Sequence, residues 1–454
     1  MADDDRFYVK SLTLENFRCF EKTELGPFDP HFNLLVGENG TGKSSVLVAL
    51  AYLYAAISTP PGAVIRAPWS YSDIRKFVNR SQIFNRPQHT SAGLRSQFKP
   101  VGDERLGSKG RQSFSSLYMT HIAEGEREET SFHDPFVAVE DAGAKVEPGV
   151  SPIALFYTTD RRFRDAEDRG EPLPPVASPR FAAFAGWSNA GSSGRSLSDW
   201  MRDETLAKHQ GDARFVSAGA NLGEARAGYF VDAVSAALLD AIAGATDVAY
   251  IGRERDIVVG FADGSRQPFS RMSDGQRALI GLVADIARRM CILNGQDLGP
   301  AVLTETPGLV LIDEIDLHLH PKWQREILGA LKRIFPKIQF FATTHSPQVI
   351  GEAKPEEIVM LTKDGKQKRP AGSYGMDSNW VLECVMEAEG RDPAIAKQIK
   401  DLWTSIEDGE FEAARVQIEM LRGEIGPLAP DLAGAESYMW RMEQEARGAD
   451  EAAE

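Results

Sequence analysis

Short apolar runs bounded by turn residues alternate along this chain with segments of helical periodicity. The runs Phe32–Val36, Leu309–Ile312 and Ile338–Phe341 are dominated by apolar residues, as expected of strands that are buried on both faces of a sheet. Two stretches, Ser44–Ala56 and Ala278–Leu293, carry apolar residues at helical spacing. Strands and helices that alternate in this way predict an α/β fold in which strand ends carry the functional residues.

The first apolar run leads directly into the segment GENGTGKS, Gly37–Ser44. This spacing of glycines, lysine and serine is that of a phosphate-binding loop, in which backbone N–H groups converge on the phosphates. Lys43 adds a positive charge, Ser44 offers a hydroxyl to Mg²⁺, and the following helix points its positive end at the same anion. We predict ATP and Mg²⁺ as cofactors, with nucleotide contacts from Asn39, Gly40, Gly42, Lys43, Ser44 and Ser45.

Two further strand ends carry residues suited to phosphate chemistry. Asp313 and Glu314 follow Leu309–Ile312, and we expect Asp313 to hold Mg²⁺ and Glu314 to polarise the attacking water. The strand Ile338–Phe341 is followed by two threonines and His345, which suits a sensor of the γ-phosphate. A solvated acidic pair and a structural histidine are the alternative interpretations of these residues.

The segment Met272–Gln276, MSDGQ, precedes the helical stretch Ala278–Leu293. The Ser273 hydroxyl, the Gly275 backbone and the helix dipole would therefore point at one spot. Within one chain this spot would be far from the phosphate-binding loop. A plain helix cap is the alternative interpretation, and the other motifs favour a nucleotide contact that includes Gln276.

Taken together, these motifs resemble those of ABC-type ATPases of the SMC, RecF and OLD-like group, which have an amino-terminal sheet hairpin before the phosphate loop. The segment Tyr8–Phe20 alternates like a strand and contains the NFR opening of that group. Asp313–Pro321 and Ser373–Met386 are most similar to PtuA-type ATPases of Septu and retron-associated anti-phage systems. The resemblance implies an ABC-type P-loop NTPase with a mixed sheet core, an amino-terminal antiparallel hairpin, a large insertion and a carboxyl-terminal helical module.

The resemblance also assigns roles to residues that match the motifs. It implies that Ser273 and Gly275 close over ATP held by a second copy, and that His345 is the switch histidine. The D-loop, which in this family lies between the two copies, would contain Asp316, His318 and His320. The sequence departs from the LSGGQ pattern at Met272 and Asp274, and the negative charge of Asp274 near a phosphate would weaken closure or need a basic neighbour such as Arg277. The Q-loop glutamine stays open among Gln82, Gln88 and Gln97.

Composition narrows the partners and the compartment. The chain has 454 residues, a formal charge of −15 and three scattered cysteines, which argues against wholesale wrapping of nucleic acid and against a disulfide framework. No long apolar span or basic leader is present, so we expect a cytoplasmic protein without a membrane partner. The segment Arg75–Arg111 is basic with interleaved phenylalanines, which fits either a nucleic-acid contact or a solvated insertion.

The order of these features predicts four regions: an ATPase lobe at 1–56, a partly flexible insertion at 57–228, a second ATPase lobe at 229–365 and a helical partner-docking module at 366–454. The chain lacks long heptad repeats and a C-x-x-C hook, which disfavours the long-armed repair and chromosome ATPases. The resemblance implies an ATP-dependent homodimer or higher assembly that regulates a separately encoded HNH-type nuclease. A RecF-like DNA repair ATPase and a non-hydrolysing structural module are the alternatives.

Overall fold

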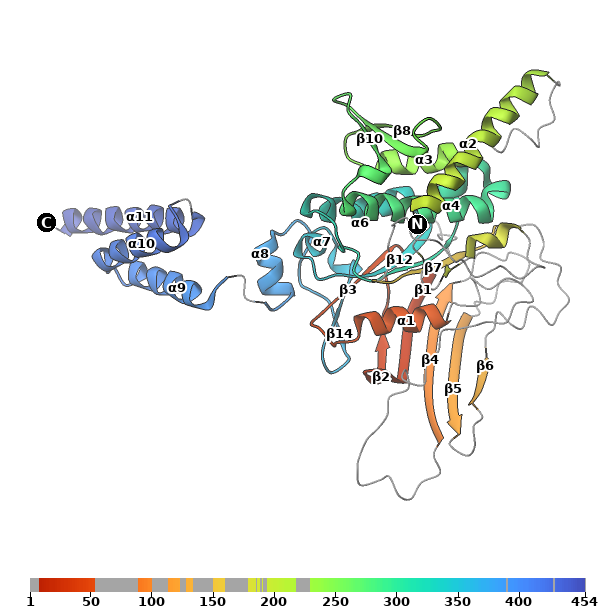
Figure 1. The fold of residues 1–454 in the computed structure, drawn as a ribbon. Helices are drawn as coiled ribbons and strands as arrows, with labels where there is room; N and C mark the ends of the chain where they lie inside the picture. The colour runs from red at the N-terminus through yellow and green to blue at the C-terminus, as the bar shows by residue number, and fades with distance from the viewer. Residues whose placement is uncertain are drawn as a thin grey trace. The chain divides into compact units, whose positions relative to one another are not determined.

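The computed structural model describes residues 8–53, 89–99, 113–122, 128–133, 150–159, 179–217 with gaps at 185, 188–189 and 191–193, 229–388, 391–427 and 429–453. The chain forms two compact units, Met1–Val381 and Leu382–Glu454. Among the described residues, no helix combines the length and the apolar character that a bilayer span requires. Figure 1 shows the elements of both units in the order of the chain.

A six-stranded sheet forms the centre of the first unit. Its strand order is β14-β13-β3-β12-β11-β7, and all neighbours are parallel except β13 and β14. The strands are β3 (Phe32–Val36), β7 (Ile153–Tyr157), β11 (Gly308–Ile312), β12 (Ile338–Thr343), β13 (Ile358–Leu361) and β14 (Gln367–Lys368). Every residue of β3, β7, β11 and β12 is buried, because helices cover both faces of a parallel sheet. The three strands predicted from apolar runs are therefore confirmed.

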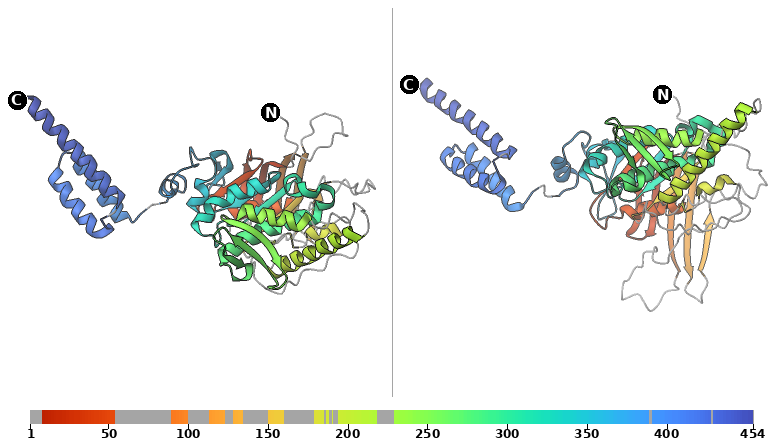
Figure 2. Two further views of the ribbon diagram at one scale, coloured as in Figure 1. Left: turned by 90° about the horizontal axis from the view of Figure 1, so that it is seen from above. Right: turned by 45° about the horizontal axis from the view of Figure 1, so that its top comes forward.

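A second, antiparallel sheet has the order β2-β1-β4-β5-β6. Its strands are β1 (Tyr8–Phe17), β2 (Phe20–Leu25), β4 (His89–Lys99), β5 (Ser113–Ile122) and β6 (Glu128–His133). The alternating segment Tyr8–Phe20 thus contains the predicted hairpin turn, with Arg18 at a φ of 47°. Helix α1 (Lys43–Leu53) shares one buried apolar cluster with residues of both sheets. Figure 1 and Figure 2 show α3 (Tyr229–Ala241), α4 (Asp274–Leu298) and α6 (Pro321–Ile334) on the side of the central sheet opposite α1.

The described parts of residues 57–228 contribute strands to both sheets of the first unit. They supply β4 to β6 of the antiparallel sheet, and they supply β7, which pairs with β11 along its whole length. Every residue of β7 is buried, and removal of this strand would expose the edge of β11. Strand β7, which lies within the expected insertion, is therefore part of the central six-stranded sheet.

Helices and a small sheet complete the lobe that carries the MSDGQ segment. The order β10-β9-β8 is antiparallel, with strands β8 (Ala245–Ile251), β9 (Asp256–Phe261) and β10 (Arg266–Pro268). The helical elements are η4 (Pro179–Phe184), α2 (Gly194–Ser217), α3 (Tyr229–Ala241), η6 (Phe269–Arg271), α4 (Asp274–Leu298), η7 (Gly299–Ala301), α5 (Val302–Glu305) and α6 (Pro321–Ile334). Helix α4 begins four residues before the predicted start, directly after Ser273.

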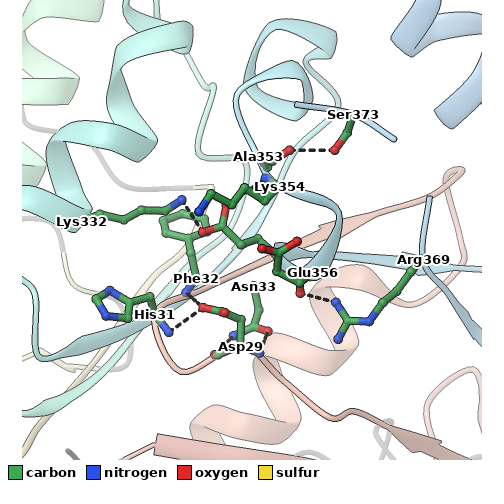
Figure 3. A network of polar contacts seen from close by, with 11 residues as sticks. Asp29, His31, Phe32, Asn33, Lys332, Ala353, Lys354, Glu356, Arg369 and Ser373 are labelled. Atoms are coloured by element: carbon green, nitrogen blue, oxygen red, sulfur yellow. Dashed lines mark hydrogen bonds and ion pairs between the residues drawn. The ribbon is translucent and has the colours of Figure 1, made fainter. Parts of the chain in front are cut away.

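The end of the first unit lies later in the chain than the predicted boundary at residue 366. Beyond α7 (Pro347–Gly351) and η8 (Pro355–Glu357), the chain continues to contact the first unit. Figure 3 shows Arg369 donating to the Glu356 carbonyl and Ser373 donating to the Ala353 carbonyl. Residues 366–381, including the short helix α8 (Ser378–Trp380), therefore belong to the first unit, where Arg369 and Ser373 find their hydrogen-bond acceptors.

The carboxyl-terminal unit is helical. A π-helical turn, η9 (Val381–Val385), runs across the start of this unit, and α9 (Pro393–Glu407), α10 (Phe411–Ile425) and α11 (Pro430–Ala453) follow. One apolar cluster joins the three long helices, with members Ile399, Leu402, Ile406, Ala414, Ile418, Leu421, Leu432, Ala435 and Met439. Gly409, at a φ of 80°, separates α9 from α10.

Candidate nucleotide site

The phosphate-binding loop connects β3 to α1, the order that the motif requires. Gly40 and Gly42 have φ values of 84° and 97°, a backbone region that favours glycine. The Lys43 ammonium donates hydrogen bonds to the loop's own carbonyls, to Gly37 at 2.7 Å and Glu38 at 2.9 Å. The lysine charge is therefore held at the mouth of the loop.

The acidic strand end of β11 meets this loop directly. Asp313 Oδ1 accepts hydrogen bonds from the Ser44 hydroxyl at 3.0 Å and from the Thr343 hydroxyl at 2.6 Å. The Thr343 hydroxyl oxygen also accepts from the Glu314 backbone N–H at 2.7 Å. Thr343 thus fixes both acidic residues from the neighbouring strand β12. A hydroxyl at the end of a buried strand is the sequence signal for this role, and the sequence pattern alone predicts Thr343 only as part of the sensor segment.

A cavity of about 360 Å³ lies above these strand ends. It contains nine of the predicted site residues: Asn39, Gly40, Gly42, Lys43, Ser44, Ser45, Asp313, Glu314 and His345. Three residues outside the predicted set complete its lining: Arg18, Cys19 and Thr343. The fold therefore brings phosphate-binding, acidic and sensor residues into one volume, although they come from segments about 300 positions apart in the sequence.

The β1–β2 turn is packed tightly against the phosphate loop. A Cβ atom added to Gly42 would lie 2.4 Å from Phe20 Cζ and 2.7 Å from Cys19 Sγ. Glycine is thus required at this position for two reasons, the backbone conformation and the close approach of the hairpin. The sequence offers the NFR segment as a hint of this contact, but it gives no distance.

Charges in the cavity perturb two titratable groups. Burial lowers the pKa of Lys43, and the nearby carboxylates of Asp313 and Glu314 partly oppose this shift. Partial burial and the positive charge of Lys43 lower the pKa of His345, against the opposing influence of Asp316 and other carboxylates. At neutral pH the His345 imidazole is therefore uncharged, and it can donate or accept a hydrogen bond at a phosphate oxygen.

The side chains at the end of the cavity fit Mg²⁺. The Ser44 hydroxyl and the Asp313 carboxylate are hard oxygen ligands that lie 3.0 Å apart, and Mg²⁺ in nucleotide sites takes few protein ligands besides phosphate and water. These two residues could therefore hold the metal, which would supply charge neutralisation at the phosphates. Among the described residues, no cluster of three or more His, Cys, Asp or Glu forms a separate metal site.

The MSDGQ segment forms a complete helix cap at the start of α4. The Gln276 backbone N–H donates to Ser273 Oγ at 3.4 Å, and the Ser273 N–H donates to Gln276 Oε1 at 3.0 Å. Arg277 lies 2.5 Å from Asp274, so the basic neighbour that Asp274 was expected to need is present. None of Ser273, Gly275 and Gln276 lines the phosphate cavity. The cap geometry and a nucleotide contact are compatible, because Ser273 is exposed.

The segment after β11 is held by the strand beside it. The Thr344 hydroxyl donates to Asp316 Oδ1 at 2.6 Å, and His318 has a φ of 63°. His320 Nδ1 accepts from the Lys322 N–H at 3.3 Å, so this histidine caps α6. For the Q-loop, Gln82 and Gln88 lie outside the described residues, and Gln97 is described only through the backbone of β4.

Comparisons with known proteins agree with this geometry. Residues 32–351, more than half of the chain, match the AAA_21 family, described as "AAA domain, putative AbiEii toxin, Type IV TA system". The chain is similar to the probable ATPase of retron Ec83 of Escherichia coli, with 45% identity over 27% of this chain and 22% of that protein. It is similar to the Septu protein PtuA of Bacillus thuringiensis, with 31% identity over 35% of this chain and 41% of that protein. The alignments thus span less than half of either relative.

Among solved structures, the chain is similar to an SMC head bound to the C-winged helix domain of ScpA. That comparison gives 18% identity and a TM-score of 0.45, over 80% of this chain and 96% of the other.

Proposed function

We propose, from the premise that the chain belongs to this AAA family and is an ABC-type ATPase related to PtuA, that two copies pair head to tail. Each ATP would lie between the loop Gly37–Ser44 of one copy and Ser273 and Gly275 of the other. The paired ATPase would be the nucleotide-dependent component of an anti-phage defence complex that regulates a separately encoded HNH-type nuclease. Higher assemblies would be built from this pair.

One observation carries the pairing. The phosphate cavity is lined by the loop, by Asp313 and Glu314 and by His345, but by no residue of the MSDGQ segment. That segment nevertheless presents an exposed serine, Ser273, at the positive end of a 25-residue helix, which attracts anions. A second copy would therefore complete the site, and a two-fold axis would complete both sites at once.

The side chains around the cavity divide the work of hydrolysis. The Ser44 and Asp313 oxygens would hold the metal, and Glu314 would orient and polarise the attacking water. The Glu314 backbone has a φ of 50° and is anchored by the Thr343 hydroxyl, so its carboxylate is presented by a constrained turn. Neutral His345 would contact the γ-phosphate and report its presence.

The pairing can be tested by mixing two inactive variants. Lys43→Ala removes the phosphate contact of its own copy, and Ser273→Arg blocks the site of the other copy. In a head-to-tail pair of one Lys43→Ala and one Ser273→Arg copy, both lesions fall on the same site and the other site is intact. We expect about a quarter of wild-type hydrolysis from an equal mixture, because half of random pairs are mixed and each has one intact site. No recovery on mixing would refute the shared site.

A second variant distinguishes an enzyme that hydrolyses ATP from a protein that uses ATP only as a structural ligand. Glu314→Gln keeps the shape of the side chain but cannot accept a proton from water. We expect at least a hundredfold lower turnover and an ATP-bound pair that light scattering detects. Unchanged turnover would favour a non-hydrolysing module.

The carboxyl-terminal unit has the composition of a docking surface for a basic protein. Residues 382–454 contain 18 Asp and Glu against 7 Lys and Arg, a formal charge of −11 out of −15 for the chain. On α10, Val416 and Met420 are 61% and 63% exposed and lie one turn apart, whereas Ala414, Ile418 and Leu421 on the other face are buried. Exposed apolar residues in an acidic surface fit a basic, amphipathic segment of a nucleic-acid enzyme.

The docking surface is tested with the purified nuclease. Val416→Glu and Met420→Glu on α10 should each weaken binding at least tenfold, because an anchor residue is replaced by a charge. Trp440→Glu is the matched control, since Trp440 is 63% exposed on α11 of the same unit. Binding that neither α10 variant affects would exclude this face. DNA-stimulated hydrolysis without any nuclease would instead favour direct action on DNA, as in a RecF-like repair ATPase.

A further inference from the structure

A buried polar cluster connects helix α4 to the end of strand β7, outside the nucleotide cavity. The Tyr157 hydroxyl donates to Asp285 Oδ2 at 2.9 Å, and both residues are fully buried. Asp285 also accepts from Arg288 at 2.9 Å and from Arg289 at 2.8 Å. Burial and the Asp285 carboxylate raise the pKa of Tyr157 far above its usual value, so the phenol keeps its proton and stays a donor.

The same tyrosine touches the catalytic strand through its backbone. Tyr157 is the last residue of β7 and pairs with Ile312 at the end of β11. Its carbonyl oxygen accepts from the Asp313 N–H at 2.8 Å. Tyr157 therefore binds α4 with its side chain and Asp313 with its main chain. Along α4, Asp285 lies about 18 Å from the capping Ser273, at about 1.5 Å of rise per residue.

Stability alone does not explain this cluster. A buried carboxylate with two guanidinium groups loses hydration free energy that its internal contacts only partly restore, and apolar residues of similar volume are often as stable. The network does supply one fixed geometry, since each charged group has a directed hydrogen bond. Arg289 also donates to the Ala183 carbonyl of η4 at 2.6 Å, which fixes the acceptor Asp285 in turn.

We propose that Tyr157 is a positioning residue for ATP hydrolysis: its hydrogen bond to Asp285 fixes the end of β7 against α4, and its carbonyl thereby holds Asp313 in the geometry that serves the metal. This role acts inside one copy and requires only the ATPase activity, so it does not depend on a nuclease partner. Because Ser273 caps the start of α4, the same connection would let nucleotide contact at the helix start reach Asp313.

Tyr157→Phe removes one buried hydroxyl and preserves the ring. We expect kcat to fall about tenfold and the KM for Mg·ATP to rise only several-fold, because Asp313 serves the metal and not the adenine or ribose. Binding of a fluorescent ATP analogue in EDTA should equal wild type, whereas the additional affinity that Mg²⁺ provides should shrink several-fold.

Thr306→Val is the matched control. Thr306 is fully buried just before β11, and its hydroxyl accepts from Asn294 of α4 at 3.2 Å. This variant also removes one buried hydroxyl between α4 and the region of β11, but at the opposite end of the strand from Asp313. We expect a similar loss of thermal stability, with kcat and the Mg²⁺ effect unchanged.

Two results would overturn the proposal: a kcat for Tyr157→Phe within about twofold of that for Thr306→Val, or an equal loss of nucleotide binding with and without Mg²⁺. Should Tyr157→Phe not fold, Asp285→Glu applies the same test from the helix, because it keeps the charge and moves the acceptor by one methylene. A wild-type kcat in Asp285→Glu would then refute the proposal.

Discussion

The close contact between the β1–β2 turn and the phosphate loop gives a prediction whose size can be worked from the structure. In Gly42→Ala the new methyl carbon would lie 2.4 Å from Phe20 Cζ and 2.7 Å from Cys19 Sγ. The residue would also have to keep a φ of 97°. We estimate about 1–2 kcal/mol for the backbone conformation and about 1–3 kcal/mol for the overlap, a total of about 2–5 kcal/mol.

Gly40→Ala separates these two terms. Gly40 has a similar φ of 84°, but a Cβ added there meets no atom within 4 Å. It should therefore cost only the backbone term, about 1–2 kcal/mol. Urea denaturation of both variants, monitored by circular dichroism, measures the difference directly. Adding Phe20→Leu to Gly42→Ala should restore part of the loss, because the overlapping ring atom is removed. Equal losses for Gly40→Ala and Gly42→Ala would refute the steric argument.

Three further predictions concern titratable groups. Saturating Mg·ATP should protect Cys19 from labelling by maleimide, because Cys19 is exposed in the nucleotide cavity. Mass spectra should show Cys291 unlabelled with or without nucleotide, because this thiol is buried and burial raises its pKa. The folded-state pKa of His345 is below its ordinary 6.5, so at acidic pH the folded protein binds fewer protons than the unfolded chain. The free energy of unfolding should therefore fall as the pH drops below about 6.5 toward that lowered pKa. His345→Gln should flatten this part of the pH–stability curve. Lys332→Met should lower the free energy of urea unfolding by about 3 kcal/mol, because it removes the ammonium that forms an ion pair with the buried Glu357 carboxylate. A loss below about 1 kcal/mol would contradict the role of this pair.

The elements that the sequence predicts best are those whose residues face the same surroundings on every side. The core strand Leu309–Ile312 is apolar throughout because both faces are covered, so its chemistry at Asp313 could be placed at a strand end. The hairpin within Tyr8–Phe20 was harder to delimit, because Arg18 at positive φ turns the chain without a glycine. Helix α4 is longer than predicted, because the capping box of Ser273 and Gln276 starts it at Asp274, before the first apolar position of the pattern, and it runs on to Leu298 before Gly299.

Pairings between distant segments were beyond the sequence for a different reason. Strand β7 lies next to β11 although about 150 residues separate them, and an apolar run of five residues fits any buried edge. The basic segment that could have been a solvated insertion contributes β4, which pairs with β1. In both cases backbone hydrogen bonds determine which strands pair, whereas the side chains in the sequence indicate only that a strand is buried.

The placement of β7 also explains why a strand with no catalytic side chain belongs in an ATPase core. Without β7, the Asp313 N–H at the end of β11 would lose its acceptor, the Tyr157 carbonyl, and an acidic residue on an unpaired edge would sample several positions. Asp313 is instead held from two sides, by Tyr157 on β7 and by the Thr343 hydroxyl on β12. Only the second constraint uses a residue type that a motif could capture. Hydrolysis therefore depends on a backbone contact that substitutions can reach only indirectly, through the side chain that anchors Tyr157 to α4.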